Sequence, residues 1–146
     1  MFFSKSFGYA LRGVLYVAIK SEENRKVRVE EIAKRLSVPR HFLGKVMNRI
    51  VKECILNSTK GPYGGFSINQ ETLTAPLIRL LRITDGMEQF NNCVLKLKKC
   101  NSKNPCPLHL YMEKSRDELL RIFSQTTVAD LLSQDKKMLI QSIATA

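Results

Sequence analysis

The chain has 146 residues, of which 44% are hydrophobic and 25% charged, which suits one soluble globular domain, or a small domain with an appended element, and excludes a disordered protein. It contains no apolar run of about 18 residues and no apolar core near its N-terminus, so neither a membrane span nor a signal peptide is expected. We therefore expect a cytoplasmic protein whose four cysteines are reduced thiols or metal ligands rather than a disulfide framework.

The formal net charge of +11 is unevenly distributed along the chain. Residues 1–66 hold 13 of the 24 Lys and Arg but only 5 of the 13 Asp and Glu, which gives this part a net charge of +8. A basic half of this kind is typical of a nucleic-acid-binding protein, although a basic surface that only improves solubility would give the same count.

The first half predicts three helices. Residues 6–20 have apolar side chains near the 3.6-residue period, with Ser6 as a candidate N-cap. Two shorter helices follow, over 30–36 and from Pro39 to about Lys52, joined by a tight turn. Such a pair is the helix-turn-helix plan, in which the second helix reads DNA.

The second helix of this pair is amphipathic in the predicted arrangement. Its inner face is expected to hold Phe42, Leu43, Val46, Met47 and Ile50. Its outer face carries candidate DNA contacts, although a solvated helix face would also be basic: Arg40, His41, Lys45, Arg49 and Lys52.

A β-hairpin is predicted next. Residues 54–58 are typical of a strand, and apolar residues resume at Phe66 after a glycine-rich tip that is expected to need positive φ at several positions. A hairpin directly after a recognition helix is a wing, and its candidate DNA contacts are Lys60, Gly61 and Tyr63. Cys54 is expected to be a buried structural thiol.

The other three cysteines lie close together in a lysine-rich stretch. Cys93, Cys100, Cys106 and His109 follow the spacing C-x6-C-x5-C-x2-H. Neighbouring cations favour the thiolate, which is the form that binds metals or reacts. Unrelated surface cysteines, a structural zinc site and an iron–sulfur cluster all remain open here; structural zinc usually takes C-x2-4-C pairs, which are absent, so the spacing slightly favours a cluster.

From Pro107 the chain is predicted to be helical as far as residues 125–127, where Thr126 or Thr127 would cap a further helix over 128–132. Its apolar stripe is best buried against a second copy of the chain, although folding back onto its own domain would also cover it. The stripe comprises Leu108, Met112, Leu119, Leu120, Ile122 and Phe123. Residues 135–146 predict a terminal helix that adds little to the core.

The stretches 4–12, 29–52, 60–66 and 73–86 together resemble the IscR/NsrR/CymR-type winged-helix transcription regulators, and the cysteine stretch falls where cluster-binding members carry three cysteines. The resemblance implies a mainly α fold with a small β wing. It implies a winged helix-turn-helix DNA-binding domain over 1–86, and a cysteine-rich sensor loop with a long dimerisation helix over 87–146. It also implies a homodimeric regulator, not an enzyme, that binds a pseudo-palindromic operator in double-stranded DNA.

The resemblance further implies a ligand set. Cys93, Cys100 and Cys106 match the three cluster cysteines, and His109 matches the fourth ligand of the members that hold a two-iron, two-sulfur cluster. Other members take that ligand from a carboxylate near the N-terminus, and Gly8 occupies the matching position here, which favours His109. The first cysteine gap is one residue longer than in the IscR pattern.

Two departures concern the DNA. Gly44 stands where members often carry a glutamate that discriminates between DNA sites, and Lys60 replaces an arginine that commonly enters the minor groove. The target DNA sequence is therefore not carried over. Two alternatives remain beside the cluster-controlled regulator: a cluster-free regulator that responds to thiol oxidation or to a partner enzyme, and a small iron–sulfur redox protein.

Overall fold

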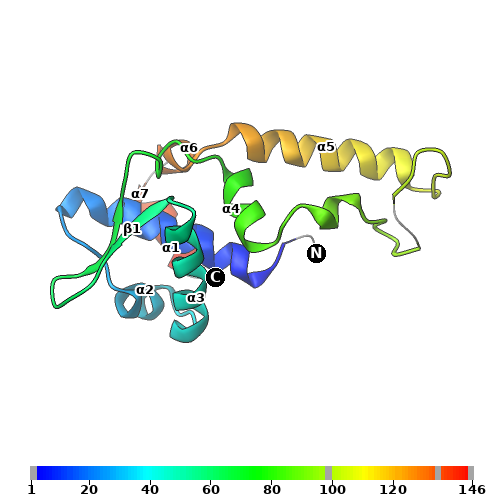
Figure 1. The fold of residues 1–146 in the computed structure, drawn as a ribbon. Coiled ribbons are helices and arrows are strands. Elements are labelled where there is room, and N and C mark those ends of the chain that lie inside the picture. Colours follow the sequence, from blue (N-terminus) through cyan, green and yellow to red (C-terminus); the bar gives the residue numbers. More distant parts are fainter. Residues whose placement is uncertain (1–2, 98–99, 134–135, 145–146) are drawn as a thin grey trace.

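The computed structural model describes residues 3–97, 100–133 and 136–144, and it confirms the predicted mainly α fold with a small wing (Figure 1). The elements in chain order are α1 (Lys5–Lys20), η1 (Ser21–Glu23), α2 (Val29–Leu36), α3 (Arg40–Lys52), β1 (Leu56–Thr59), β2 (Gly65–Ile68), α4 (Leu77–Thr84), η2 (Glu88–Asn91), α5 (His109–Gln125), α6 (Val128–Leu132) and α7 (Lys136–Ala144). Within these ranges no helix is both long and apolar enough to cross a membrane.

The helix α1 lies at the centre of the core and contacts α2, α3, α4, β2, α6 and α7. Its buried face includes Ala10 and Val14, which are completely inaccessible to solvent. The prediction of Ser6 as the N-cap is wrong, because the helix begins earlier and the hydroxyl of Ser4 accepts a hydrogen bond from the Phe7 amide at 3.2 Å. The amide of Ser4 in turn donates to the carboxylate of Asp85, at the end of α4, at 2.8 Å.

The helices α2 and α3 form the predicted helix-turn-helix, and Ser37 with φ of 53° makes the turn between them. Pro39 is the N-cap of α3 rather than its first residue. Four of the five predicted inner-face residues are buried: Leu43, Val46, Met47 and Ile50. Phe42 is the exception at 60% exposed, because it lies at the edge of this buried stripe, about 100° around the helix from Leu43.

The hairpin is confirmed, with β1 and β2 paired antiparallel from Leu56 opposite Ile68 to Thr59 opposite Gly65. Two hydrogen bonds between Val27 and Phe66, of 2.7 and 2.9 Å, attach strand β2 to the segment before α2. The strand begins two residues later than predicted. Cys54 precedes it in the left-handed region with φ of 62° and is exposed, so the prediction of a buried thiol is wrong.

The glycines of the wing serve two different purposes. Gly61 and Gly65 have φ of 103° and 141°, as expected for a tight hairpin end. Gly64 has no such φ; a Cβ there would stand 2.1 Å from the carbonyl oxygen of Thr59. The expectation of positive φ thus holds for two of the three positions, and close backbone approach explains the third.

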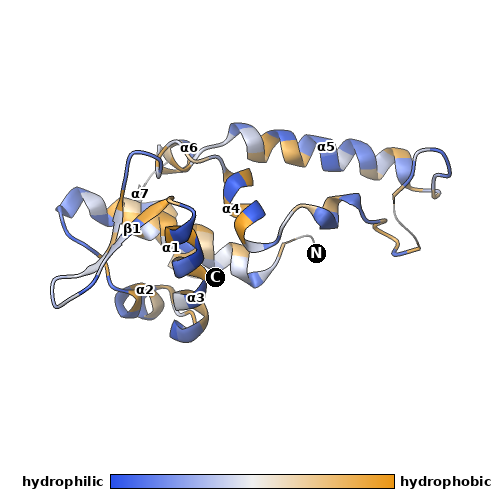
Figure 2. Cartoon of the chain, in the orientation of Figure 1, coloured by the Kyte–Doolittle hydropathy of each residue, from blue (hydrophilic) through white to orange (hydrophobic). Residues whose placement is uncertain are grey.

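The C-terminal part consists of α5, which extends beyond the main body, and two short helices that return to it (Figure 1). Apolar and polar residues alternate along α5 (Figure 2), and Leu119, Leu120 and Phe123 pack partly buried against the core. Thr127 caps α6 through a capping box with Asp130, as predicted for one of the two threonines.

The terminal helix α7 contributes more to the core than predicted. It packs on α1 and α2, and its Ile143 is only 6% exposed. The physical reason is that Leu139, Ile140 and Ile143 all pack against the hydrophobic core. Residues 135, 145 and 146 of the predicted terminal helix lie outside the described residues.

Candidate DNA interface and cysteine cavity

The outer face of α3 carries the predicted DNA contacts, but they differ in how they are held. His41 and Lys45 are exposed on it. Arg40 forms an ion pair with Glu30 of α2 at 2.6 Å, and this hydrogen bond lowers the pKa of Glu30 below its ordinary value. Arg49 donates to the carbonyl oxygen of Ile83 in α4. The two arginines therefore fix the position of α3 against α2 and α4, which their spacing in the sequence did not indicate.

The wing is held beside α2 by a contact that the sequence analysis missed. Arg28, the residue before α2, donates to the carbonyl oxygen of Gly61 at 2.6 Å. Tyr63 is 91% exposed at the tip, and Lys60 is exposed at its edge. An open groove of about 670 Å³ separates the wing from the start of α2, with Lys26, Arg28 and Tyr63 among its lining residues. The sequence signal for the contact between Arg28 and Gly61 was the basic residue that stands directly before α2.

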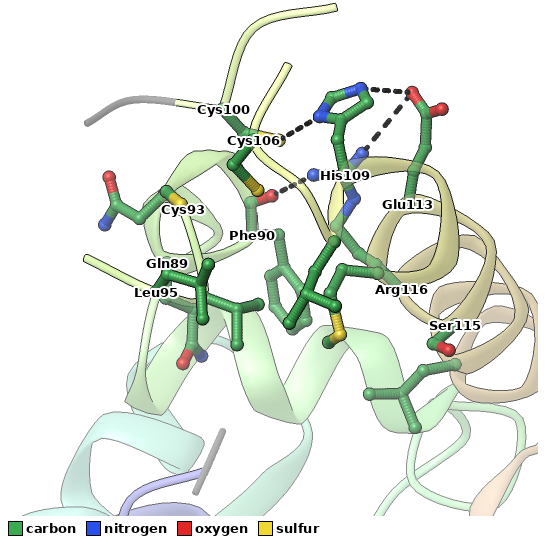
Figure 3. A pocket seen from close by; sticks show the side chains of 15 residues that line it. Gln89, Phe90, Cys93, Leu95, Cys100, Cys106, His109, Glu113, Ser115 and Arg116 are labelled. Atoms are coloured by element: carbon green, nitrogen blue, oxygen red, sulfur yellow. Dashed lines mark hydrogen bonds and ion pairs between the residues drawn. The ribbon is translucent and has the colours of Figure 1, made fainter. Parts of the chain in front are cut away.

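The four predicted cluster ligands line one cavity of about 300 Å³ at the start of α5 (Figure 3). Cys93 and His109 are each 6% exposed, and Cys100 and Cys106 are half-buried. The remaining lining is largely apolar, as is typical of a binding cavity. It comprises Gln89, Phe90, Asn92, Val94, Leu95, Leu108, Met112, Glu113, Ser115, Arg116 and Leu119.

Backbone contacts close the loop around this cavity. The amide of Cys100 donates to the carbonyl oxygen of Asn91 at 3.0 Å. The amide of His109 donates to the backbone carbonyl oxygen of Cys106 at 3.0 Å. The side-chain guanidinium of Arg116 donates to the carbonyl oxygen of Phe90 at 2.8 Å. These bonds bring the two ends of the cysteine stretch together on α5.

The imidazole of His109 lies between a thiol and a carboxylate. Its Nδ1 is 3.3 Å from the Sγ of Cys100, and its Nε2 is 3.8 Å from the Oε1 of Glu113 one turn further along α5 (Figure 3). The second distance is too long for a hydrogen bond. Glu113 was not predicted, although its i,i+4 relation to His109 on a helix was a readable signal.

The cavity also contains buried polar atoms without partners. Among the described residues, two such side-chain atoms have no hydrogen-bond partner, Nε2 of Gln89 and Nε2 of His109, and both belong to lining residues. A buried unsatisfied polar group is rare in native proteins and often marks a site for a ligand.

The predicted ligand set is only partly brought together. Cys100 and His109 are in contact, but within the described part of the chain no three His, Cys, Asp or Glu side chains are placed to hold a metal ion. Three thiols and an imidazole are nevertheless the donor chemistry that iron–sulfur clusters take, and the Nδ1 of His109, which faces the Sγ of Cys100, fits the same use. The assignment of these four side chains as cluster ligands therefore stays a prediction. The donor atoms in the cavity are chemically suited to it.

Comparison with known proteins places the chain in a family. Residues 3–134 match the sequence model of Rrf2, described as an iron-dependent transcriptional regulator. An HTH-type transcriptional regulator of Aquifex aeolicus (strain VF5) is 35% identical over 141 residues, which cover 95% of this chain and 96% of the relative. The HTH-type regulator NsrR of Geobacillus kaustophilus (strain HTA426) is 25% identical over 125 residues, covering 85% and 84%.

A solved structure agrees on the fold. The structure of CymR, the global cysteine regulator of B. subtilis, superposes with a TM-score of 0.76 at 20% identity, covering 93% of this chain and 99% of that one. The two chains thus share one fold over nearly their whole length. This chain belongs to the Rrf2 family of winged-helix transcriptional regulators.

Proposed function

We propose that this regulator acts as a homodimer on a pseudo-palindromic operator, and that an iron–sulfur cluster held by Cys93, Cys100, Cys106 and His109 modulates its DNA binding. The observation that carries the proposal is the cavity at the start of α5: all four side chains line it, and Nδ1 of His109 lies 3.3 Å from the Sγ of Cys100. The description of the family as iron-dependent supports the same chemistry.

When bound, a cluster would supply a redox-active group. Binding of the cluster would restrain the loop between η2 and α5, and its loss would free that loop. His109 is fixed as the first residue of α5, whereas the three cysteines come from the loop. Cluster binding would therefore restrain the loop against the start of α5.

A continuous set of contacts leads from this loop to the DNA-binding helices. Arg116 joins α5 to η2, and Phe123 near the other end of α5 stacks on Phe7 of α1 with ring centroids 5.8 Å apart. The helix α4 packs on α5 and is joined to α3 through Arg49. A shift of α5 would thus displace its contacts with α1 and, through α4, with α3. Such a chain of contacts is required to couple the cysteine cavity to the DNA-binding helices.

The dimer would form along α5. Leu110 and Tyr111 are each 74% exposed, and Leu108 and Ile122 are exposed by 41% and 43%. A second copy would cover this apolar surface and place two α3 helices on one duplex, about 34 Å apart on successive turns. In this proposal residues 1–86 bind DNA, while residues 87–146 form the sensor and the dimer contact.

The first test is a visible absorption spectrum of protein purified without oxygen, with iron, sulfide and zinc assayed on the same sample. Matched iron and sulfide are expected, and Cys100→Ala should lose both while Cys54→Ala, which alters an exposed thiol remote from the cavity, keeps them. Operator affinity should then differ between the loaded and the cluster-free protein. Equal affinity would show that sensing is wrong while DNA binding stands.

A second candidate, a cluster-free thiol sensor, is favoured by the 3.3 Å contact between the Sγ of Cys100 and the Nδ1 of His109. An imidazole at a thiol assists its oxidation, in which peroxide converts the thiol to a sulfenic acid and is itself reduced to water. Metal-free protein should then change its operator affinity after peroxide treatment and recover with a thiol reductant. Cys100→Ser should bind operator but not respond.

A further inference from the structure

Phe42 is a large apolar side chain on α3 that the core does not use. It is 60% exposed, whereas the four buried apolar residues of the same helix are at most 4% exposed. It lies in the first turn, where the ring of His41 meets it edge-on with centroids 6.2 Å apart. A single exposed apolar residue is common on protein surfaces and does not by itself indicate a function. A functional role for Phe42 must therefore be argued from its position on α3.

That position is the part of α3 that is available to DNA. Arg40 and Arg49 are engaged with Glu30 and with the Ile83 carbonyl, while Lys45, one turn after Phe42, is exposed. In a helix-turn-helix protein the N-terminal residues of the recognition helix contact base edges. The basic surroundings favour DNA over an apolar protein surface as the occupant.

We propose that Phe42 determines part of the operator sequence by contacting the 5-methyl group of a thymine in the major groove. The inference rests on the proposed binding of an operator by α3. A phenyl ring has no donor or acceptor, so it reads no hydrogen-bonding base edge and holds no phosphate. The thymine methyl is the apolar feature of the major groove, and phenylalanine is among the side chains that contact it.

The proposal predicts a dependence on one methyl group. Replacing thymine by deoxyuridine removes that group and leaves every hydrogen-bonding atom of the base pair unchanged. For the wild-type protein one thymine in each half-site should be sensitive, with a loss of about fourfold in affinity per methyl, the value that corresponds to burying one such group. Phe42→Ala should bind both duplexes equally.

The experiment begins with selection of an operator from random duplexes by the full-length wild-type protein. Each thymine is then replaced singly by deoxyuridine, and affinities are measured at fixed salt for the wild type, Phe42→Ala and the control Leu73→Ala. Leu73 is also an exposed apolar residue, but it lies in the turn before α4, away from α3, so its variant should keep the methyl dependence. The salt dependence of Phe42→Ala should equal that of the wild type, because no phosphate contact is lost.

Several outcomes would overturn the inference. If no thymine is sensitive in the wild type, or if Phe42→Ala keeps the same sensitivity, Phe42 does not read a methyl group although operator binding stands. A steeper or shallower salt dependence for the variant would indicate a general change in docking instead. A wild-type protein that selects no duplex would overturn both the inference and the proposed operator binding. Thermal unfolding of Phe42→Ala checks that the exposed substitution leaves the fold unchanged.

Discussion

Gly44 leaves an open position in the middle of α3. No atom lies within 4 Å of a Cβ built there, and a glycine in a helix interior costs about 1 kcal/mol relative to alanine. Gly44→Ala is therefore expected to raise the free energy of unfolding by about 0.5–1 kcal/mol in denaturant titrations. Gly13→Ala is the control, because its Cβ would meet the Sδ of Met47 at 2.5 Å and the gain should be cancelled. Equal gains in both variants would contradict this reading of the packing.

Gly64 is needed for a different reason, namely the close approach of two backbone segments in the wing. Gly64→Ala would force its Cβ against the Thr59 carbonyl oxygen, so the wing end must open. We expect weaker operator binding with unchanged helix content by circular dichroism. Gly8→Ala, where nothing lies within 4 Å of the added atom, should bind as the wild type does. A wing variant of full affinity would show that the wing end does not contact DNA.

Glu31 links α2 to α1 and to the segment before it. The guanidinium of Arg25 donates to it at 2.6 and 2.8 Å and the hydroxyl of Tyr16 at 3.0 Å, and the bond from Arg25 is the main reason that the pKa of Glu31 lies below its ordinary value of 4.5. A lowered carboxyl pKa stabilises the fold above the ordinary value and ceases to do so as the pH falls through the folded-state pKa. Glu31→Gln should therefore be less stable than the wild type at pH 7, with the difference shrinking below about pH 4. A difference that is constant with pH would exclude this ionic contribution.

At the scale of elements, the helix-turn-helix and the wing could be predicted because periodicity and glycine placement are local signals. The exposure of Phe42 and Cys54 could not, because each lies at the edge of a pattern, where one residue decides between core and surface. The partner of Arg49 lies 34 residues away in α4, and no local pattern encodes such a contact. The cysteine stretch predicted which side chains share a cavity, but not Gln89 or Glu113, which only the folded helix ends bring there.

The aromatic contact between α5 and α1 is the element-scale feature that a mutation can test. Phe123 stacks on Phe7 and on Phe3, whose ring centroid is 5.1 Å away. Phe123→Ala should cost about 1–3 kcal/mol of unfolding free energy and reduce the difference in operator affinity between loaded and cluster-free protein. Leu73→Ala, which alters an exposed apolar residue outside α5, is the control and should preserve that difference. Full coupling in the Phe123 variant would mean that α4 alone transmits the signal.

At the scale of the whole molecule, the cysteine loop and the DNA-binding helices lie at opposite ends (Figure 1). If the cluster restrains the loop, trypsin should cleave at Lys96 and Lys103 more slowly in loaded protein than after removal of the cluster by a chelator. Mass spectrometry of the fragments measures both sites without reference to DNA. Cleavage at Lys60 in the wing provides the internal control, since it should not change if restraint is confined to the loop.

The return of α7 onto α1 and α2 has a consequence for how the protein is made. The helix-turn-helix and the wing are complete in sequence by residue 68, yet the core around α1 is closed by Val128 of α6 and Ile143 of α7. A nascent chain whose recognition helix has left the ribosome still lacks α6 and α7, which pack on α1, and α7 also packs on α2. Stable DNA-binding units would thus arise only after residues 136–144 have emerged, and a chain interrupted after the wing would be expected to aggregate or be degraded before it could occupy an operator.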